Sequence, residues 1–597
     1  MTSPWLWPVV FFLMTAQASP MQHAPGGGCS PTVTAVPPHV TIVCQGVDPQ
    51  VLQPLNAVLD TTDLDLHGKV RQAEAWVRIY HAVVQLLAEA QGDDDLAREA
   101  HALVQAGKFT EAGALLDRML ASPGDAKPER VAAYHLSRAE VFALQFKLSE
   151  ALPHYAAASR AHATPPQYTY RYAVVLQQQR RYTEAEPLYR ATLNALRPFI
   201  STDPTTYVPV VAMALNSLAS LYQQTQRIPE AEAVYQEAVT TYRQLAETQP
   251  TTYLPDVAAT LHNLAVLYSS TRRLPEAVAA YREALVIHRQ LAQATPTAYL
   301  SGVATTLQNL ATIYTGTREL TQAEVAYQEA LAIYRQLAQA HPAAYLPDIA
   351  TTLTNLAVLY TSAHRLPEAE AAYREALTLR RQLAQTNPAA YLPKVATTLN
   401  NLGALYNDAR RLSEAEAAFQ EALTLRRQLA QGNPAAYLPG IATTLYNLGG
   451  LYIAARRPSE AEAVYQDALT VQRQLAQTNP AAYLPDVAAT LHTLAILALA
   501  QSRPQDAAEW IGEAVTIRRT LWQHEPGTQH EPGAHGNALA QSLALEAETL
   551  KRTGAETPAV CTRLHEATRV VSDARLRQLV HQRMQAWCGD TGQQKQP

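Results

Sequence analysis

The chain has 597 residues and a net charge of −5, and 17% of its residues are charged. This balance does not predict binding to nucleic acid or to an acidic membrane surface. Hydrophobic residues make up 48% of the chain but aromatic residues only 7%. A core of small aliphatic side chains suits closely packed helices, and the sequence therefore predicts an all-α protein.

The N-terminus predicts export. Residues 5–14, WLWPVVFFLM, form an apolar run that Ala16-Gln17-Ala18 follows as a cleavage pattern. Residues 1–18 are therefore interpreted as a secretory signal peptide, and the protein is expected in the periplasm or outside the cell, with the cytoplasm as the alternative. The run is too short to span a membrane, and no later stretch qualifies.

Four cysteines lie outside the repeats described below, in two local pairs: Cys29 with Cys44, and Cys561 with Cys588. An even count after a signal peptide favours two disulfides near the chain ends. Four free thiols in a cytosolic protein are the alternative. Residues 19–47, which hold the first pair, are rich in Pro and Gly and then show short β-like alternation.

Residues 48–95 predict a long helix or coiled coil. Apolar residues between positions 55 and 87 recur at alternating steps of four and three, which is a heptad pattern. A coiled coil here would make the protein a homo-oligomer. The alternative is a helix that folds back onto the first repeat.

A 46-residue period dominates the rest of the chain and defines seven repeats over residues 201–522. Tyrosines mark it at Tyr207, Tyr253, Tyr299, Tyr345, Tyr391, Tyr437 and Tyr483. Within one repeat, Leu261, Leu264 and Tyr268 form the apolar stripe of a first helix, and Ala277 and Tyr281 begin that of a second. A small residue recurs at position 265, where the two helices approach each other. A fixed period predicts a stack of like units and not a single reaction centre.

The order large, Leu, small, aromatic, then Ala, aromatic, Ala resembles the tetratricopeptide repeat (TPR). Phrases such as EAEAAYREAL resemble the long repeats of the kinesin light chain and its bacterial relatives. Three shorter copies in residues 96–200 bring the total to ten. The resemblance implies a right-handed superhelical solenoid of about ten helix pairs. A Pro/Gly-rich linker (523–536), a helical cap (537–590) and a tail (591–597) follow.

No catalytic motif is present: the chain lacks a phosphate-binding Gly loop, H-E-x-x-H and G-x-S-x-G. Neither an enzymatic activity, a cofactor nor a metal site is expected.

Two ladders of side chains repeat with the helices. The first consists of the amides Asn263, Asn309, Asn355, Asn401 and Asn447 on the first helix of each repeat. By the resemblance this helix lines a concave groove, where an amide can pair with the backbone of an extended peptide. Alternatively, each Asn ties neighbouring repeats together.

The second ladder is basic and lies on the second helix: Arg243, Arg289, Arg335, Arg381, Arg427, Arg473 and Arg519. It predicts either one ion pair per repeat or a stripe that binds an acidic partner.

Together these features predict a non-enzymatic scaffold that holds a partner protein or extended peptide in the groove. The alternatives are a structural protein in which the array is a spacer, and a regulatory subunit of an enzyme on another chain.

Overall fold

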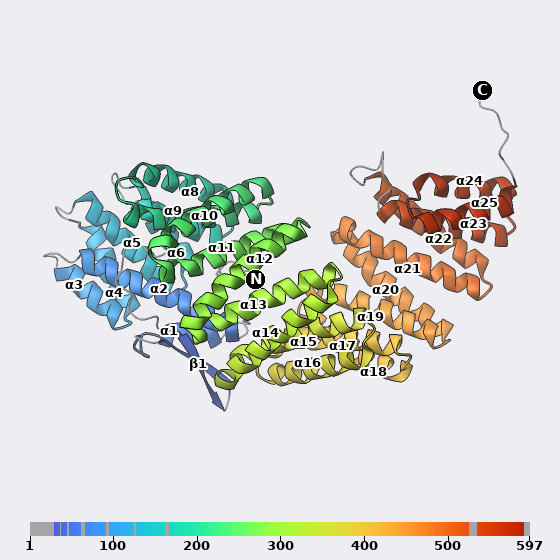
Figure 1. The fold of residues 1–597 in the computed structure, drawn as a ribbon, viewed down its shortest axis with the longest axis horizontal. Helices are drawn as coiled ribbons and strands as arrows, with labels where there is room; N and C mark the ends of the chain where they lie inside the picture. Colours follow the sequence, from blue (N-terminus) through green and yellow to red (C-terminus); the bar gives the residue numbers. More distant parts are fainter. Residues whose placement is uncertain are drawn as a thin grey trace, which may run out of the picture. The chain divides into compact units, whose positions relative to one another are not determined.

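The structure is a computed structural model that describes residues 29–35, 38–44, 47–60, 66–90, 95–123, 127–160, 166–524 and 534–589. The predicted signal peptide and C-terminal tail, and most of the predicted linker, lie outside the described residues. The chain divides into two compact units, which are described separately (Figure 1). The first unit comprises residues 1–365 and 382–390, and the second comprises residues 366–381 and 391–597.

A β-hairpin opens the described chain. Strand β1 (Cys29–Ala35) pairs antiparallel with β2 (Pro38–Cys44), in a register that sets Cys29 opposite Cys44. Cys44 is disulfide-bonded. The hairpin contacts α1 (Gln53–Asp60) and α2 (Leu66–Ala90).

The heptad positions of α1 and α2 are buried within the chain, so the prediction of a coiled coil is not confirmed. Leu55, Leu59 and Leu87 are fully buried, and Val77 and Tyr80 nearly so. Helix α2 packs on α3 (Asp95–Gln105) and α5 (Pro128–Leu144). Its apolar face contacts the first repeats, which is the alternative that the sequence left open, and is not available to a second chain.

Three short helix pairs form the irregular repeats. Besides α3 and α5 they contain α4 (Phe109–Ala121), α6 (Leu148–Arg160), α7 (Pro166–Gln178) and α8 (Tyr182–Leu196). A 3-10 turn, η2 (Arg197–Phe199), follows α8.

Seven long helix pairs follow, in agreement with the predicted ten repeats. They are α9 (Pro204–Gln224), α10 (Ile228–Thr248), α11 (Pro250–Ser270), α12 (Leu274–Ala294), α13 (Pro296–Gly316), α14 (Leu320–Ala340), α15 (Pro342–Ser362), α16 (Leu366–Thr386), α17 (Pro388–Asp408), α18 (Leu412–Gly432), α19 (Pro434–Ala454), α20 (Pro458–Thr478), α21 (Pro480–Ala500) and α22 (Pro504–Gln523). First helices from α9 onward begin with proline, whose fixed φ and missing N–H suit the first helical position.

The predicted stripes form the contact between the two helices of each pair. In α11 and α12, Leu261, Leu264, Ala265, Ala277 and Tyr281 are all buried. The small residue allows the aromatic ring of the second helix to come close. In α19 of the second unit the equivalent position is Gly449. The space between the two helices there is too narrow for alanine, because a Cβ added at Gly449 would lie 2.6 Å from the ring of Tyr465.

The turn between the two helices of a repeat needs one residue with positive φ. The chain places Gly107 there in the first repeat but a side chain in the later ones, with φ between 57° and 63° at Phe146, Arg180, Gln226, Arg272, Arg318, His364, Arg410, Arg456 and Ser502. A non-glycine residue in this conformation costs roughly 1 kcal/mol relative to glycine.

In six of the seven long repeats, the residue after the turn ties the repeat to the one before it. Arg273 donates to Glu232 of the preceding second helix at 2.6 Å and to Glu276 of its own at 2.9 Å, and it lies 4.5 Å from the ring centre of Tyr268. The same bridge to a preceding Glu, at 2.6–2.8 Å, recurs at the residues called here the anchor arginines: Arg227, Arg273, Arg365, Arg411, Arg457 and Arg503.

One position of each long second helix faces the helix that follows it, and its side chain is buried in six of the seven long repeats and half-buried at His288. It is filled by the residues called here the slot residues: Tyr242, His288, Tyr334, Arg380, Arg426, Gln472 and Arg518. Arg426 donates to the Gly440 carbonyl at 2.5 Å and to the Thr444 hydroxyl. Gln472 accepts from Thr490 at 2.8 Å. The slot residues therefore supply polar contacts between repeats inside an otherwise apolar interface.

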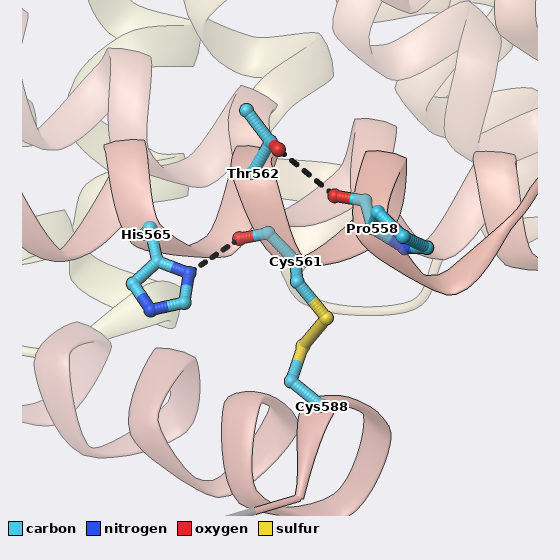
Figure 2. Close-up of a disulfide and its surroundings, with 5 residues drawn as sticks. All are labelled: Pro558, Cys561, Thr562, His565 and Cys588. Carbon is cyan, nitrogen blue, oxygen red and sulfur yellow. Dashed lines mark hydrogen bonds between the residues drawn. A yellow bond between two sulfur atoms is a disulfide. The ribbon is translucent and has the colours of Figure 1, made fainter. Parts of the chain in front are cut away.

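The C-terminal cap comprises α23 (Ala534–Arg552), α24 (Thr557–Val570) and α25 (Ala574–Cys588), and α23 packs on α22. Figure 2 shows the disulfide that joins Cys561 of α24 to Cys588 of α25, one of the predicted pairs. Among the described helices, only α21 has the length and apolar composition of a membrane span. It packs between α20 and α22 as the first helix of the last long repeat.

Candidate functional site: the inner surface of the first helices

The first helices of successive repeats form an inner layer. Direct contacts join α7 to α9, α9 to α11 and α13 to α15 in the first unit, and α21 to α23 in the second. Second helices pack on the outside of this layer, against the first helices on either side. The solvent-facing side of the first helices is called the inner surface below.

Each first helix presents one row of four positions to this surface. On α11 these are Ala259, Asn263, Val266 and Ser270, which lie at steps of four, three and four and therefore share a helix face. Ala259, Val266 and Ser270 are exposed, and Asn263 is half-buried. The remaining sides of the helix carry the buried stripes.

The structure places all five predicted asparagines in this row, and all five are half-buried. In the first unit, the side-chain amides of Asn263, Asn309 and Asn355 make no hydrogen bond to another group of the described chain. They lie on α11, α13 and α15, which are consecutive first helices. A half-buried amide that the protein leaves unpaired is a group available to a ligand.

Asn447 differs, because its Nδ2 donates to Oδ1 of Asn400 in the neighbouring repeat at 3.2 Å. The same step along the chain joins Tyr446 to Thr493 at 3.3 Å. For Asn447 the geometry is that of a tie between repeats, and the five residues predicted as one ladder therefore fall into two kinds.

In the rows of α11, α13, α15, α17, α19 and α21, the only charged side chain is the exposed Asp408 of α17. The row contains threonines whose hydroxyls are already used, such as Thr351, which donates to the Pro347 carbonyl at 2.9 Å. It also contains exposed aliphatic side chains, among them Val266, Val358 and Ile496, which are 38%, 43% and 49% exposed. No Lys or Arg occurs in the rows of α11, α13, α15, α17, α19 and α21.

The predicted basic ladder lies on the second helices, where it forms ion pairs. Arg289, Arg381 and Arg473 each donate to a Glu of the next repeat's second helix at 2.6 Å. Arg427 is 4.0 Å from Asp467, and Arg335 also has a partner. These contacts have the geometry of the ion-pair alternative, and binding of an acidic partner by this ladder stays a prediction.

Sequence reasoning missed the anchor arginines and the arginines with positive φ. Both are visible as Arg-Arg pairs at 272–273, 410–411 and 456–457. Their spacing of 46 or its multiples was the available signal. The sequence does not reveal that the second arginine of each pair forms ion pairs with two glutamates, whereas the first forms none within the described residues.

No group of three or more His, Cys, Asp or Glu side chains that could hold a metal ion occurs among the described residues.

The fold and this surface define a helical repeat protein. The sequence model of the tetratricopeptide repeat matches residues 167–244, 210–290, 256–336, 348–428, 394–474 and 441–520. These matches cover more than half of the chain, and the chain belongs to the tetratricopeptide repeat family.

Solved structures with similar folds include BtubC (BKLC) from P. vanneervenii, at 26% identity and a TM-score of 0.35, over 42% of this chain and 92% of that one. RapI in its apo form has 12% identity and a TM-score of 0.45, over 66% of this chain and 99% of that one. A tetratricopeptide repeat protein from Parabacteroides merdae has 16% identity and a TM-score of 0.32, over 54% and 98%. Comparison with curated protein sequences gives no match.

Proposed function

We propose that the protein is a non-enzymatic scaffold that binds an extended, largely uncharged segment of a partner protein on its inner surface. The observation that carries this proposal is the set of three unpaired, half-buried amides on consecutive first helices, Asn263, Asn309 and Asn355. Membership of a family of protein-interaction repeats supports it.

The chemistry of the surface suits a peptide backbone. A primary amide both donates and accepts hydrogen bonds, so it can pair with peptide N–H and C=O groups whatever the side chains. Between the amides, Val266 and Val358 offer exposed apolar surface to the partner's side chains. The rows of α11, α13 and α15, which carry the three amides, contain no charged side chain, and this favours an uncharged segment.

The test uses the full chain and peptides selected from a displayed random library on the unaltered protein. The triple variant Asn263→Ala, Asn309→Ala and Asn355→Ala is expected to bind these peptides about a hundredfold more weakly. This estimate counts about 1 kcal/mol for each of the three lost hydrogen bonds. Its thermal midpoint should stay nearly unchanged, because these amides make no bond to the chain.

A matched control removes three amides of equal spacing from the second helices, Gln290, Gln336 and Gln382, which are exposed on the outer layer. This control is expected to bind like the unaltered protein. A triple Asn variant that melts early but still binds its peptides, measured well below its melting point, would contradict the proposal.

We propose, separately, that the protein is exported. The signal-like N-terminal run and the disulfide between Cys561 and Cys588 support this localisation, because structural disulfides persist in oxidising compartments. Mass spectrometry of the protein from its native source tests it. An intact Met1 together with four free thiols would rule export out.

A further inference from the structure

Cations without partners repeat along the edge where each first helix turns into the second. Arg272 and Arg318 in the first unit, and Arg410 and Arg456 in the second, are exposed residues of these turns. Within each unit the two belong to consecutive repeats. These four residues are called the turn cations.

None of the four guanidinium groups forms an ion pair, hydrogen bond or ring contact within the described residues. For Arg272, Arg410 and Arg456 the adjacent anchor arginines explain why. Arg457 lies next to Arg456 and holds both Glu416, at 2.7 Å, and Glu460, at 2.6 Å. At the turns of Arg272, Arg410 and Arg456 the nearby carboxylates are thus already paired. The turn of Arg318 has Glu319 in place of an anchor arginine, and this carboxylate accepts from Thr317 at 3.0 Å and from Gln322 at 3.1 Å.

The backbone conformation gives no structural reason for arginine at these positions. Each turn cation has a φ between 57° and 63°, where glycine is preferred, and the first repeat does use Gly107. Phe146, Gln226, His364 and Ser502 hold the same conformation in other repeats, so the turn itself does not require arginine. Arginine at four of these turns, with no contact in the described residues, is therefore available for binding.

We propose that the turn cations bind an acidic segment of a partner protein, one carboxylate for each turn. This surface lies at the turns and not on the inner surface, and the inference does not depend on the proposed peptide site. A guanidinium accepts a carboxylate with two parallel hydrogen bonds.

The charge pattern favours an acidic protein segment over a denser polyanion. Single cations one repeat apart alternate with exposed carboxylates of the anchor pairs, such as Glu276 and Glu460. Closely spaced phosphates or lipid headgroups would meet these carboxylates as well as the cations. A flexible chain can place separate carboxylates at separate turns.

The test measures binding of a fluorescein-labelled decaglutamate peptide to the full chain at low ionic strength by fluorescence anisotropy. Each exposed charge pair is expected to contribute about threefold in affinity. The double variants Arg272→Gly/Arg318→Gly and Arg410→Gly/Arg456→Gly should therefore bind about tenfold more weakly. Added salt should have the same effect on the unaltered protein.

The same variants are expected to raise the midpoint of thermal unfolding by roughly 1–2 °C, because glycine relieves the positive φ. Opposite changes in binding and stability are a result that a purely structural role does not give. Arg272→Lys/Arg318→Lys keeps the charge and should keep most of the binding.

Arg289→Gln/Arg381→Gln serves as the control of equal charge, because both guanidinium groups already have carboxylate partners. This control should bind decaglutamate nearly as well as the unaltered protein. The proposal is overturned if the glycine variants bind like the unaltered protein or if the control loses as much. It is also overturned if phosphatidylglycerol vesicles or single-stranded DNA bind more tightly than the peptide through the same residues.

Discussion

The two units fill the same buried slot between repeats with different chemistry. In the first unit the slot residues are neutral: Tyr242, His288 and Tyr334. In the second unit three of the four are arginines: Arg380, Arg426 and Arg518, which are 6%, 8% and 9% exposed. Burial lowers the pKa of Arg380 and Arg518 to about 10. No carboxylate pairs with these three guanidinium groups among the described residues. Hydroxyls and carbonyls of the helix that follows each of them, α17, α19 and α23, accept instead.

The comparison indicates that a slot residue needs a suitable side-chain shape and a hydrogen-bonding group more than a particular charge. Room for the larger groups comes from the next first helix, where a Cβ at Gly302 would lie 2.8 Å from the His288 ring and one at Gly440 would lie 3.0 Å from Nε of Arg426. Glycine is not required at every slot, because the residue fourteen positions after Arg380 is Lys394, whose carbonyl accepts from the guanidinium at 3.3 Å. The second unit carries the larger desolvation cost.

The largest expected effect is at Arg426. Arg426→Ala leaves a cavity and takes the donor from Thr444 and the Gly440 carbonyl, which should lower the stability of the second unit by about 3 kcal/mol. Hydrogen exchange of α18 and α19 measures it. The neighbouring Arg427→Ala, which removes an exposed cation 4.0 Å from Asp467, should change exchange hardly at all. Equal effects of the two variants would remove the distinction between slot and surface.

In the first unit the slot at His288 should respond to pH. Burial, with His262 nearby, lowers the pKa of His288 from 6.5 to about 4. Between these values the unfolded chain binds more protons, so the stability present at pH 7 is lost as the pH falls from about 6.5 towards 4. The loss by pH 5 should reach about 2 kcal/mol. His288→Gln should flatten this dependence, measured by hydrogen exchange of α12 and α13.

The exposed His364 provides the control for that experiment. His364→Gln should leave the pH dependence unchanged. If His288→Gln retains the full slope, another group is responsible for it.

Smaller effects on stability, of opposite sign, are expected when two glycines of the second unit are replaced by alanine. Gly449→Ala pushes a Cβ to within 2.6 Å of the Tyr465 ring and should destabilise by about 1 kcal/mol, after the helix propensity of alanine is counted. Gly512→Ala meets nothing within 4 Å and should stabilise by about 0.5–1 kcal/mol. Thermal unfolding of both variants measures this. The same sign for both would show that close packing does not decide the residue.

The smallest effect is expected at Arg289, whose side chain is 49% exposed beside Glu329. Arg289→Gln should cost no more than about 0.5 kcal/mol in a denaturant titration. A much larger cost would mean that this ion pair is a main tie between the repeats of the first unit.

Sequence periodicity was sufficient to predict the helix pairs, because the stripes at Leu261 and Tyr281 repeat with the geometry of the α-helix. It was also sufficient to place the asparagines on the first helix. It could not show that, within the described chain, Asn447 is paired whereas Asn309 is not. The residue that decides this lies 47 positions earlier on a different row of the first helix: Asn400 for Asn447 and His262 for Asn309. That distinction depends on how neighbouring helices are rotated.

The predicted coiled coil shows a second limit of reasoning from sequence. Heptad spacing describes an apolar stripe but not what covers it, and in the structure Leu55 and Leu87 are covered by the chain's own helices. The slot arginines were not foreseen either, because a long basic side chain predicts exposure until the hydroxyl and carbonyl that receive it are known.

One interruption of the anchor arginines has a mechanical consequence. Among the seven long repeats, the sixth repeat of the chain has Glu319 where the other six have an anchor arginine, and Val278 stands where its acidic partner would be. Arg282 instead donates to the Tyr314 hydroxyl at 3.0 Å. An array with equal contacts at every junction between repeats bends evenly along its length. An array in which one junction has fewer ion pairs bends mostly at that junction. Among the long repeats of the first unit, we therefore expect compliance to concentrate at the junction of α12 with α13 and α14.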